Sequence, residues 1–314
     1  MQYYFAPMEG VTDSIYRDLH SKIFPGIHRY YTPFFSPTMH QTLTQKEKRE
    51  LPLAESLNYT LIPQVLTKIP EDFIWFTKVC QDRGYTQINL NTGCPSGTVT
   101  AKGKGSGMLR DTDGLKHFLD QIFTQSPLPI SIKTRIGYSS SEEFPEILKV
   151  FNDYPLTELI IHPRVRDQFY KGTVDQEAFT YAVHNSKHDL VYNGNLNTKE
   201  DIAKIQNAYP QVNAVMLGRG LIGDPGMVTE SGATAAQLEQ FTTLLLERYT
   251  EAFGSARNAM FRMKENWRHL LCKFDDSEKL GKKLRKTTDI DEFKAITAEI
   301  YQKCPLRQNL KAEW

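Results

Sequence analysis

The sequence contains no run that approaches 18 uncharged apolar residues, the approximate minimum for a transmembrane helix. It begins Met-Gln-Tyr-Tyr-Phe, without the basic start of a signal peptide. The 4 cysteines are widely spaced and form no C-x-x-C pair: Cys80, Cys94, Cys272 and Cys304. Such scattered cysteines argue against a disulfide framework and against a cysteine metal site. We therefore expect a cytoplasmic protein with no membrane segment and no metal.

A large excess of charge is also missing, because 38 Lys and Arg face 37 Asp and Glu, a net charge of +1. The 40% hydrophobic and 24% charged residues are typical of a globular protein. The charge is nevertheless uneven. From Arg248 to Lys286, Lys and Arg outnumber Asp and Glu by about two to one, which indicates an anionic partner.

Strand and helix patterns alternate through most of the chain. We expect strands at 3–8, 28–32, 61–66, 87–91, 130–136, 158–162, 190–193 and 214–217. We expect helices from 14, capped by Thr12, and at 70–83, 111–125, 142–152, 176–185 and 198–209. Eight strands separated mostly by helices predict a (β/α)₈ TIM barrel, an α/β fold. The alternative is an open, doubly wound sheet.

Beyond residue 235 the strand pattern stops, and four helices are expected at 237–253, 257–274, 277–286 and 291–303. The length of 314 residues suggests about two domains. We therefore predict a catalytic barrel domain at 1–234 and a small helical bundle domain at 235–314.

The fourth strand runs into Gly93-Cys94-Pro95. Glycine permits a sharp bend, and proline prevents a helix from passing through this point. The thiol of Cys94 is thus expected on a loop at the C-terminal end of a strand, beside Asn91, where barrels place their active sites. The alternative is a buried structural cysteine.

Polar or glycine-containing clusters recur where the predicted strands end, which is how a barrel builds one pocket. They are 6–10, Gln64, Asn91 with Cys94, Lys133 with Arg135, His162 with Arg164, 193–195 and 218–220. Each has a structural alternative: Gln64 satisfying buried backbone, Lys133 and Arg135 on an edge strand, His162 in the core, and Asn193-Gly194 in an ordinary turn. Together they predict a cofactor site that binds an anion, with Arg219 as a donor between two glycines.

These clusters resemble motifs of the tRNA-dihydrouridine synthases, a family of bacterial, FMN-dependent barrels. The resemblance covers roughly residues 1–230 and extends weakly into the helical tail. It rests on segments in the family's order: Ala6-Pro7-Met8-Glu9-Gly10-Val11-Thr12-Asp13, Asn91-Thr92-Gly93-Cys94-Pro95-Ser96, Lys133-Thr134-Arg135-Ile136-Gly137, His162-Pro163-Arg164, Asn193-Gly194 and Gly218-Arg219-Gly220.

The resemblance implies FMN as cofactor and NADPH as reductant. It places the flavin ring at Pro7, Met8 and Glu9, its polar edge at Gln64 and Lys133, and the phosphate end at Asn193, Gly194, Asn195, Gly218 and Arg219. His162 would border both the cofactor and the uracil. Asn195 stands where the family often has an acid, which puts a family-like side-chain role at that position in doubt.

The resemblance also implies the reduction of a tRNA uridine to dihydrouridine. Reduced flavin would supply a hydride at C6, and Cys94, as a protonated thiol, would supply the proton at C5. The substrate would lie beside Asn91, Arg135, Arg164 and Tyr170.

The tail supplies a candidate surface for tRNA. Arg257, Lys264 and Arg268 are spaced to form a basic stripe, with Phe261 and Trp267 nearby. Lys102 and Lys104, in the glycine-rich loop 97–107, are further candidates for phosphate contact. The alternatives are a solvated bundle whose aromatic residues are core, and an ordinary flexible loop instead of a mobile lid. We expect a monomer.

Two other functions remain open at this point. One is a flavin barrel acting on a small molecule, of the dihydroorotate dehydrogenase or ene-reductase type. The other is a non-catalytic RNA-binding module. Tight, salt-dependent tRNA binding would distinguish a tRNA enzyme from a flavin barrel that acts on a small molecule. Bound flavin would distinguish it from a non-catalytic RNA-binding module.

Overall fold

The computed structural model describes residues 1–310 of the chain. The chain forms two compact units. The first, here called the barrel unit, consists of Met1–Pro7, His28–Asn195 and Lys204–Met216. The second, here called the helical unit, consists of Met8–Ile27, Leu196–Ala203 and, among the described residues, 217–310.

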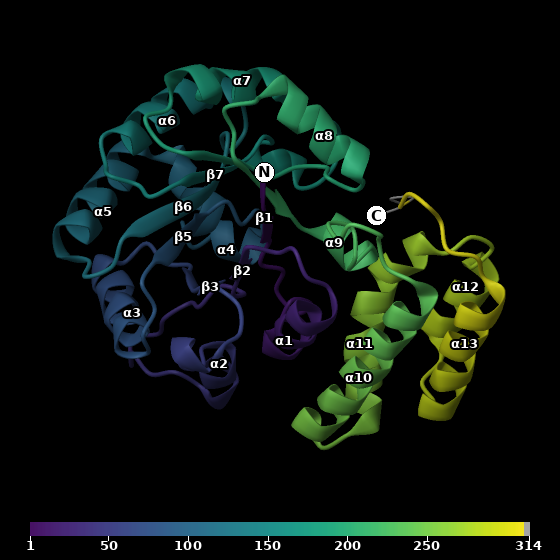
Figure 1. Ribbon diagram of the computed structural model, residues 1–314. Helices are drawn as coiled ribbons and strands as arrows, with labels where there is room; N and C mark the ends of the chain where they lie inside the picture. Colours follow the sequence, from purple (N-terminus) through teal and green to yellow (C-terminus); the bar gives the residue numbers. More distant parts are fainter. Residues whose placement is uncertain (311–314) are drawn as a thin grey trace. The chain divides into compact units, whose positions relative to one another are not determined.

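The sheet is a ring of parallel strands in the order β3-β2-β1-β9-β8-β7-β6-β5-β4 (Figure 1). Its strands are β1 (Gln2–Phe5), β2 (Arg29–Tyr31), β3 (Leu61–Ile62), β4 (Gln64–Val65), β5 (Ile88–Thr92), β6 (Ile130–Arg135), β7 (Leu159–His162), β8 (Leu190–Tyr192) and β9 (Ala214–Leu217). The predicted strands therefore exist, most with slightly shorter bounds.

The two ends of the sheet meet at Pro63. β3 pairs with β2 and β4 pairs with β5, while the single residue between β3 and β4 is a proline, which has no N–H to donate. The Pro63 carbonyl still accepts from the Asn89 N–H at 2.9 Å. β3 and β4 are thus two halves of the one strand predicted at 61–66. The sheet closes into the predicted TIM barrel, and the open-sheet alternative is wrong.

Helices follow the strands, and the longer ones lie outside the sheet (Figure 1). In chain order they are α2 (Gln45–Glu50), α3 (Pro70–Asp82), α4 (Gly97–Thr100), α5 (Thr112–Gln125), α6 (Phe144–Asn152), α7 (Gln176–Asn185) and α8 (Lys199–Ala208). Proline in the first turn of α3 and Asp111 as the N-cap of α5 explain where these two helices begin. Between β2 and β3, α2 begins with a capping box between Thr44 and Glu47.

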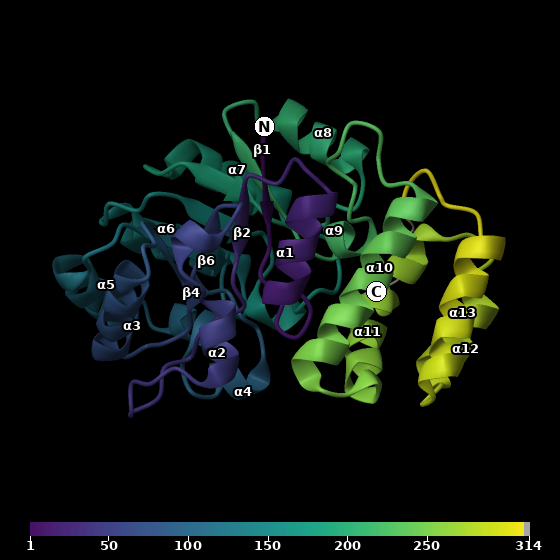
Figure 2. The same cartoon turned by 60° about the horizontal axis from the view of Figure 1, so that its bottom comes forward.

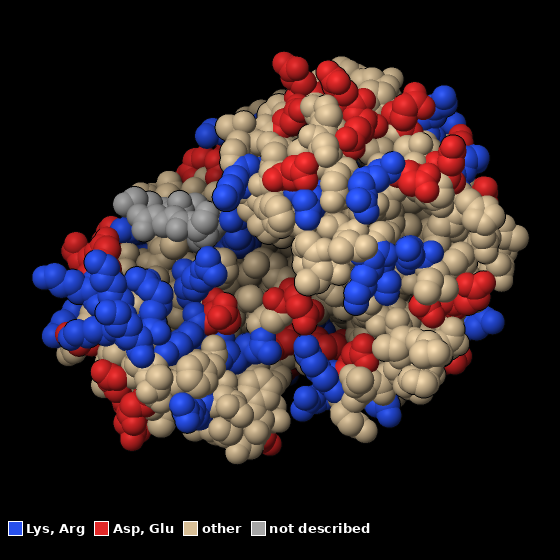
Figure 3. Space-filling view, turned by 180° about the vertical axis from the view of Figure 1, so that it is seen from behind, with Lys and Arg blue, Asp and Glu red and all other residues tan. Residues whose placement is uncertain are grey.

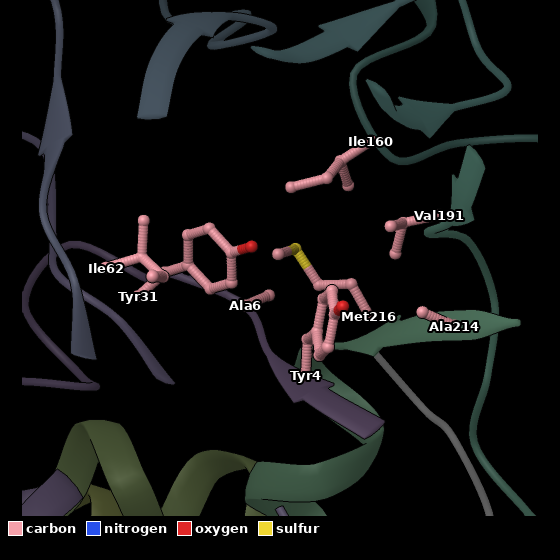
Figure 4. Packing of buried hydrophobic residues seen from close by; sticks show 8 residues of the cluster. All are labelled: Tyr4, Ala6, Tyr31, Ile62, Ile160, Val191, Ala214 and Met216. Atoms are coloured by element: carbon pink, nitrogen blue, oxygen red, sulfur yellow. The ribbon is translucent and has the colours of Figure 1, made fainter. Parts of the chain in front are cut away.

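One half of the barrel interior is apolar. Side chains from six strands converge there: Tyr4, Ala6, Tyr31, Ile62, Ile160, Val191, Ala214 and Met216 (Figure 4). Lys133 pairs with Ile160 in the register of β6 and β7, so it lies on the same inward face. Because alternate residues of a strand share a face, the inward positions of β4, β5 and β6 are polar. The interior therefore has an apolar and a polar half.

A buried carboxylate lies just before β7. Glu158 is 5% exposed and accepts from the Tyr31 hydroxyl at 2.6 Å, while Arg29 contacts its other oxygen at 2.9 Å. Burial and the Glu158 charge raise the pKa of Tyr31 well above its usual value. These paired groups satisfy one another, as buried polar groups must.

The helical unit contains α1 (Ser14–Ile23), α9 (Arg219–Gly223), α10 (Ala235–Phe253), α11 (Ala256–Leu270), α12 (Glu278–Lys286) and α13 (Ile290–Lys303) (Figures 1 and 2). The four tail helices are confirmed. The prediction that Thr12 caps α1 is wrong: Asp13 is the N-cap, and its carboxylate accepts from the Tyr16 N–H at 3.1 Å. Thr12 instead binds backbone, accepting from the Met8 N–H at 2.8 Å.

Helix α1 packs on α10. The rings of Tyr16 and Phe241 meet edge to face with centroids 5.2 Å apart, and the Tyr249 hydroxyl donates to Asp13 at 2.9 Å. In the same unit, buried Lys273 pairs with Asp224 at 2.6 Å. Among the described residues, no helix is both long and apolar enough to cross a membrane.

Candidate active site

The turn after β5 presents Cys94. The Asn91 side-chain oxygen accepts from the backbone N–H groups of Gly93 at 3.0 Å and of Cys94 at 2.9 Å. A short polar side chain that bonds the backbone two or three residues ahead fixes a tight turn. Cys94 is partly exposed, whereas the other three cysteines are buried and free. The fully buried structural cysteine considered from sequence is therefore not what the structure shows.

The segment after Cys94 packs closely against it. Ser106 donates to the Cys94 carbonyl through its N–H at 3.1 Å and through its hydroxyl at 2.8 Å. Gly105 has φ +57°, and a Cβ there would lie 2.9 Å from the same carbonyl oxygen. Segment 97–107 is thus not simply the loop expected from its glycines, because α4 lies in it and the 3₁₀ turn Gly105–Arg110 begins in it. Lys102 is exposed, while Lys104 donates to Ser36 at 3.2 Å.

The end of β6 brings a lysine and an arginine to the polar half of the barrel. Lys133 pairs with Asn91 in the register of β5 and β6. Burial, and then the charge of Arg135, lower the pKa of Lys133 to about 7, while Cys94 acts in the opposite direction. An amine with this pKa changes charge near neutral pH, as groups at functional sites often do.

Arg135 is almost fully buried and ties two loops together. Its guanidinium donates to the carbonyls of Gly93 at 2.9 Å, Val165 at 3.0 Å and Phe169 at 2.7 Å. Burial lowers its pKa to about 10, and Tyr170 partly opposes this shift. The edge-strand alternative is wrong for Arg135, because β6 lies between β5 and β7.

Arg164 holds the far end of the same loop. It donates to the carbonyls of Lys171 at 3.1 Å and Gly172 at 2.7 Å, and to the Asn195 side-chain oxygen at 3.0 Å. Another of its nitrogens lies 3.0 Å from His162 Nε2. Buried Arg135 and Arg164 thus clamp the loop 165–172, whose tip exposes Phe169 (40%) and Tyr170 (52%).

The end of β8 carries Asn193, Gly194 and Asn195. Asn193 donates to the Met216 carbonyl at 2.8 Å. A Cβ on Gly194 would lie 2.9 Å from Val174, which explains a glycine there. Asn195 has φ +48°, a left-handed conformation that asparagine tolerates better than most residues.

The barrel unit thus brings together most of the predicted residues at the C-terminal ends of its strands. They are Pro7, Gln64, Asn91, Cys94, Lys133, Arg135, His162, Arg164, Tyr170, Asn193, Gly194 and Asn195. Met8, Glu9, Gly218 and Arg219 belong to the helical unit, where Gly218 and Arg219 directly follow β9. Gln64 is fully buried, with its amide bonded to Asn89 and Asn91.

Sequence reasoning missed Asn89, Ser106 and Phe169. Asn89 stands two residues before Asn91, so the two-residue period of a strand places both on one face. That signal was present in the sequence. The contact of Ser106 with Cys94 and the positive φ of Phe169 (+51°) have no local signal, because both depend on tertiary packing.

In the helical unit, basic side chains gather over α11 and α12 (Figure 3). A hollow of about 750 Å³ there is lined by Lys264, Arg268, Lys282, Arg285 and Arg307 among others. Arg257 is exposed on the first turn of α11, where its guanidinium lies 5.8 Å from the ring centroid of Phe261. Of the two aromatic residues, Trp267 is core at 1% exposure, whereas Phe261 is 42% exposed.

A family model described as dihydrouridine synthase matches residues 4–312 of the chain. The tRNA-dihydrouridine synthase B of Proteus vulgaris is 28% identical over 226 residues, covering 72% of this chain and 69% of that protein. The tRNA-dihydrouridine(16) synthase of Shigella flexneri is 25% identical over 301 residues, covering 91% of this chain and 94% of that protein.

Two solved structures are similar in fold. Morphinone reductase in complex with tetrahydroNAD has a TM-score of 0.51 and 11% identity, covering 72% of this chain and 85% of its own. An old yellow enzyme homologue from Zymomonas mobilis also has a TM-score of 0.51 and 11% identity, with coverages of 71% and 86%. At this identity they support the barrel fold and nothing finer.

Proposed function

Because the chain belongs to the dihydrouridine synthase family, we propose that it reduces a uridine of tRNA to 5,6-dihydrouridine, with FMN as its flavin and NADPH as the reductant. The observation that carries this proposal is the group around Cys94. A partly exposed thiol, an oriented amide and a lysine with a lowered pKa lie at adjoining strand ends of one barrel.

The chemistry of these donors suits a flavin. The polar half of the barrel offers the Lys133 amine and the side chain of Asn91 at paired positions. A lysine that gains a proton near pH 7 can balance negative charge on the polar edge of a reduced ring, one of the protein's main means of tuning a cofactor. The residues present therefore fit the group that the family implies.

When bound, reduced FMN would supply a hydride to C6 of the uracil, and NADPH would reduce the flavin again. The protein supplies the proton. Cys94, held by Asn91 and Ser106, donates from its Sγ to C5, so the thiol must be protonated when the base arrives. This requirement distinguishes it from the reactive thiolate of a redox cysteine.

The remaining predicted residues are assigned by resemblance. We propose that Pro7, Met8 and Glu9 line the flavin ring, that His162 borders it, and that Asn193, Gly194, Asn195, Gly218 and Arg219 serve its phosphate end. Gln64 stays a predicted flavin ligand, although its buried amide bonds directly to Asn89 and Asn91. Arg135 and Arg164 serve the substrate by clamping the loop that carries Tyr170.

We propose that tRNA also contacts the basic side chains of the tail, including Arg257, Lys264 and Arg268, with Lys102 and Lys104 as further phosphate contacts. The barrel domain at 1–234, the tRNA-binding domain at 235–314, a monomeric state and a cytoplasmic location complete the proposal. A uridine in folded tRNA must leave its stack to reach a barrel mouth, so the enzyme must hold the rest of the molecule meanwhile.

The direct test maps dihydrouridine at each position of tRNA from cells with and without this protein. We expect one position or a small set to lose the modification on deletion, and the purified protein to be yellow. Dihydrouridine unchanged at every position, in cells with no second such gene, would contradict the proposal. Colourless protein after mild purification would contradict the flavin.

A further inference from the structure

Four polar side chains form one hydrogen-bonded chain across β4, β5 and β6 and reach the turn that carries Cys94. Gln64, Asn89 and Ser131 stand at one level of the sheet, because Gln64 pairs with Asn89 and Asn89 pairs with Ser131 in the strand register. All three are fully buried. Asn91, 7% exposed, lies two residues further along β5 on the same face.

The backbone of the turn fixes the orientation of the first amide. Two N–H groups, of Gly93 and Cys94, donate to one side-chain atom of Asn91, and a backbone N–H can only donate. That atom must therefore be the oxygen. The nitrogen of Asn91 then faces Gln64 and donates to its oxygen at 2.8 Å.

Each amide in this hydrogen-bonded chain then has only one possible orientation. Since the oxygen of Gln64 faces Asn91, its nitrogen faces Asn89 and donates to the Asn89 oxygen at 2.8 Å. The nitrogen of Asn89 donates to the Ser131 hydroxyl at 2.9 Å, and that hydroxyl donates to the Ile88 carbonyl at 3.3 Å. All donors point the same way, an arrangement in which neighbouring hydrogen bonds strengthen one another.

The hydrogen-bonded chain determines which hydrogen-bonding groups of Asn91 remain available to a ligand. Its oxygen already accepts two backbone N–H groups, and one of its two N–H groups is donated to Gln64. What remains is one N–H donor. A donor suits a carbonyl oxygen, which uracil carries at positions 2 and 4, and opposes an amino group, which cytosine carries at position 4.

We propose that Asn89 is a positioning residue: by accepting from Gln64 it holds that amide against Asn91 and keeps the remaining N–H of Asn91 directed at a carbonyl oxygen of the substrate base. This inference rests on the proposed function, in which Asn91 lies beside the uracil. Asn89 itself acts only through Gln64.

The first test needs no cofactor and no turnover. In flavin-free protein, Asn89→Leu removes the acceptor for Gln64, whereas Asn89→Asp keeps a carboxyl oxygen there whether or not it is protonated. Nuclear magnetic resonance should show the side-chain amide of Asn91 exchanging with water about tenfold faster in Asn89→Leu, as expected for one lost hydrogen bond. In Asn89→Asp we expect exchange within about twofold of wild type. Unchanged exchange in Asn89→Leu would overturn the proposal.

The second test is a double-mutant cycle read as kcat/KM for tRNA. Asn89→Leu should lower kcat/KM about tenfold in the wild-type background. It should lower kcat/KM by less than about twofold in the Gln64→Met background, where the hydrogen bonds between Asn89 and Asn91 through Gln64 are already lost. Equal losses in both backgrounds would mean that Asn89 acts elsewhere. Thr77→Val, which removes a buried hydroxyl of α3 outside the chain, controls for a general loss of stability.

Failure of the proposed function and failure of this proposal give different results. If wild-type protein does not reduce tRNA uridine, the proposed function is wrong, and the amide exchange rates still show whether the hydrogen-bonded chain holds Asn91. If Asn89→Leu does not fold, Ser131→Ala takes its place. It should lower kcat/KM by about two- to threefold in the wild-type background only, and a loss that persists with Gln64→Met would overturn the proposal.

Discussion

Two side chains at the barrel mouth have opposite requirements for a proton. Cys94 must keep its proton until the base arrives, whereas Lys133 changes charge near neutral pH because burial and Arg135 lower its pKa to about 7. They share the same surroundings, since Cys94 affects the pKa of Lys133. Substituting either residue should therefore give a different and recognisable result.

Cys94→Ala removes the proposed proton donor and leaves the turn intact, because Asn91 and Ser106 bind the backbone of residue 94. We expect flavin binding to persist and the rate of uridine reduction to fall by about 10²–10⁴-fold, the usual contribution of a general acid. Single-turnover reduction of tRNA by the loaded enzyme measures this. Cys80→Ala, a buried cysteine of α3, is the matched control. Full activity of Cys94→Ala would remove Cys94 from this role.

Lys133 makes stability depend on pH. Its pKa of about 7 in the folded protein lies below the ordinary value of 10.5, so between these values the unfolded chain binds the extra proton. The loss of stability caused by burying the Lys133 charge is therefore greatest below pH 7 and disappears as pH rises towards 10.5. The free energy of unfolding of Lys133→Met should thus exceed that of wild type by about 1–2 kcal/mol at pH 6, a value that allows for the partial exposure of Lys133. The difference should be smaller at pH 10.

Urea unfolding of the flavin-free proteins at pH 6, 8 and 10 measures this difference. Lys78→Met, at an exposed lysine of α3, is the matched control for the substitution itself. A Lys133→Met difference that is constant from pH 6 to pH 10 would contradict the lowered pKa.

Among the elements, the loop 165–172 shows how buried charge serves an exposed surface. Two guanidinium groups beneath it bind the carbonyls of Val165, Phe169, Lys171 and Gly172. Phe169 is held at φ +51°, which is rare for a bulky residue. The arginines below the loop therefore add to the bonds that the loop makes within itself, such as the one from the Val165 N–H to the Gln168 side chain at 2.9 Å.

Arg135→Lys keeps the charge but cannot reproduce three donors in a planar fork. We expect the free energy of unfolding to fall by about 2–3 kcal/mol, since bonds to a charged group are lost. Limited proteolysis should then cleave within 165–172 faster than in wild type. Arg49→Lys, on the exposed face of α2, should change neither property. Unaltered cleavage in Arg135→Lys would show that the loop holds its own shape.

The strands and helices could be predicted from sequence because their signals are local. Period-two strands, the proline at the start of α3 and Asp111 before α5 all lie within a few residues of the elements they define. The position of the site residues at strand ends could be predicted because the predicted fold was a barrel. What could not be predicted depends on distant partners: the break at Pro63, the packing of Gly105 on Cys94, and the roles of Arg135 and Arg164 as clamps.

At the scale of the whole molecule, the near-zero net charge conceals a basic surface. Helix α12 carries exposed Lys282, Lys283, Arg285 and Lys286 beside the hollow at α11 (Figure 3). Such a surface binds a polyanion by displacing its counterions, which makes binding sensitive to salt.

Reversing charge on α12 with Lys282→Glu and Lys283→Glu should weaken tRNA binding and make the slope of log affinity against log salt shallower by about 1 per lost phosphate contact. Fluorescence anisotropy at several salt concentrations measures both quantities. The control, Lys46→Glu with Lys48→Glu on α2, alters net charge equally. If both pairs weaken binding equally, α12 is not a specific contact.

The packing of α1 on α10 has a consequence for how the protein is made. α1 ends at Ile23 and α10 begins at Ala235, so the first helix leaves the ribosome some two hundred residues before its partner exists. At about 5–20 residues per second, that interval is about 10–40 s. Throughout it, the aromatic face of α1, with Tyr16 at its centre, has no cover. Until α10 has been made, this face is hydrophobic surface open to aggregation, and the packing of α10 on α1 removes that risk.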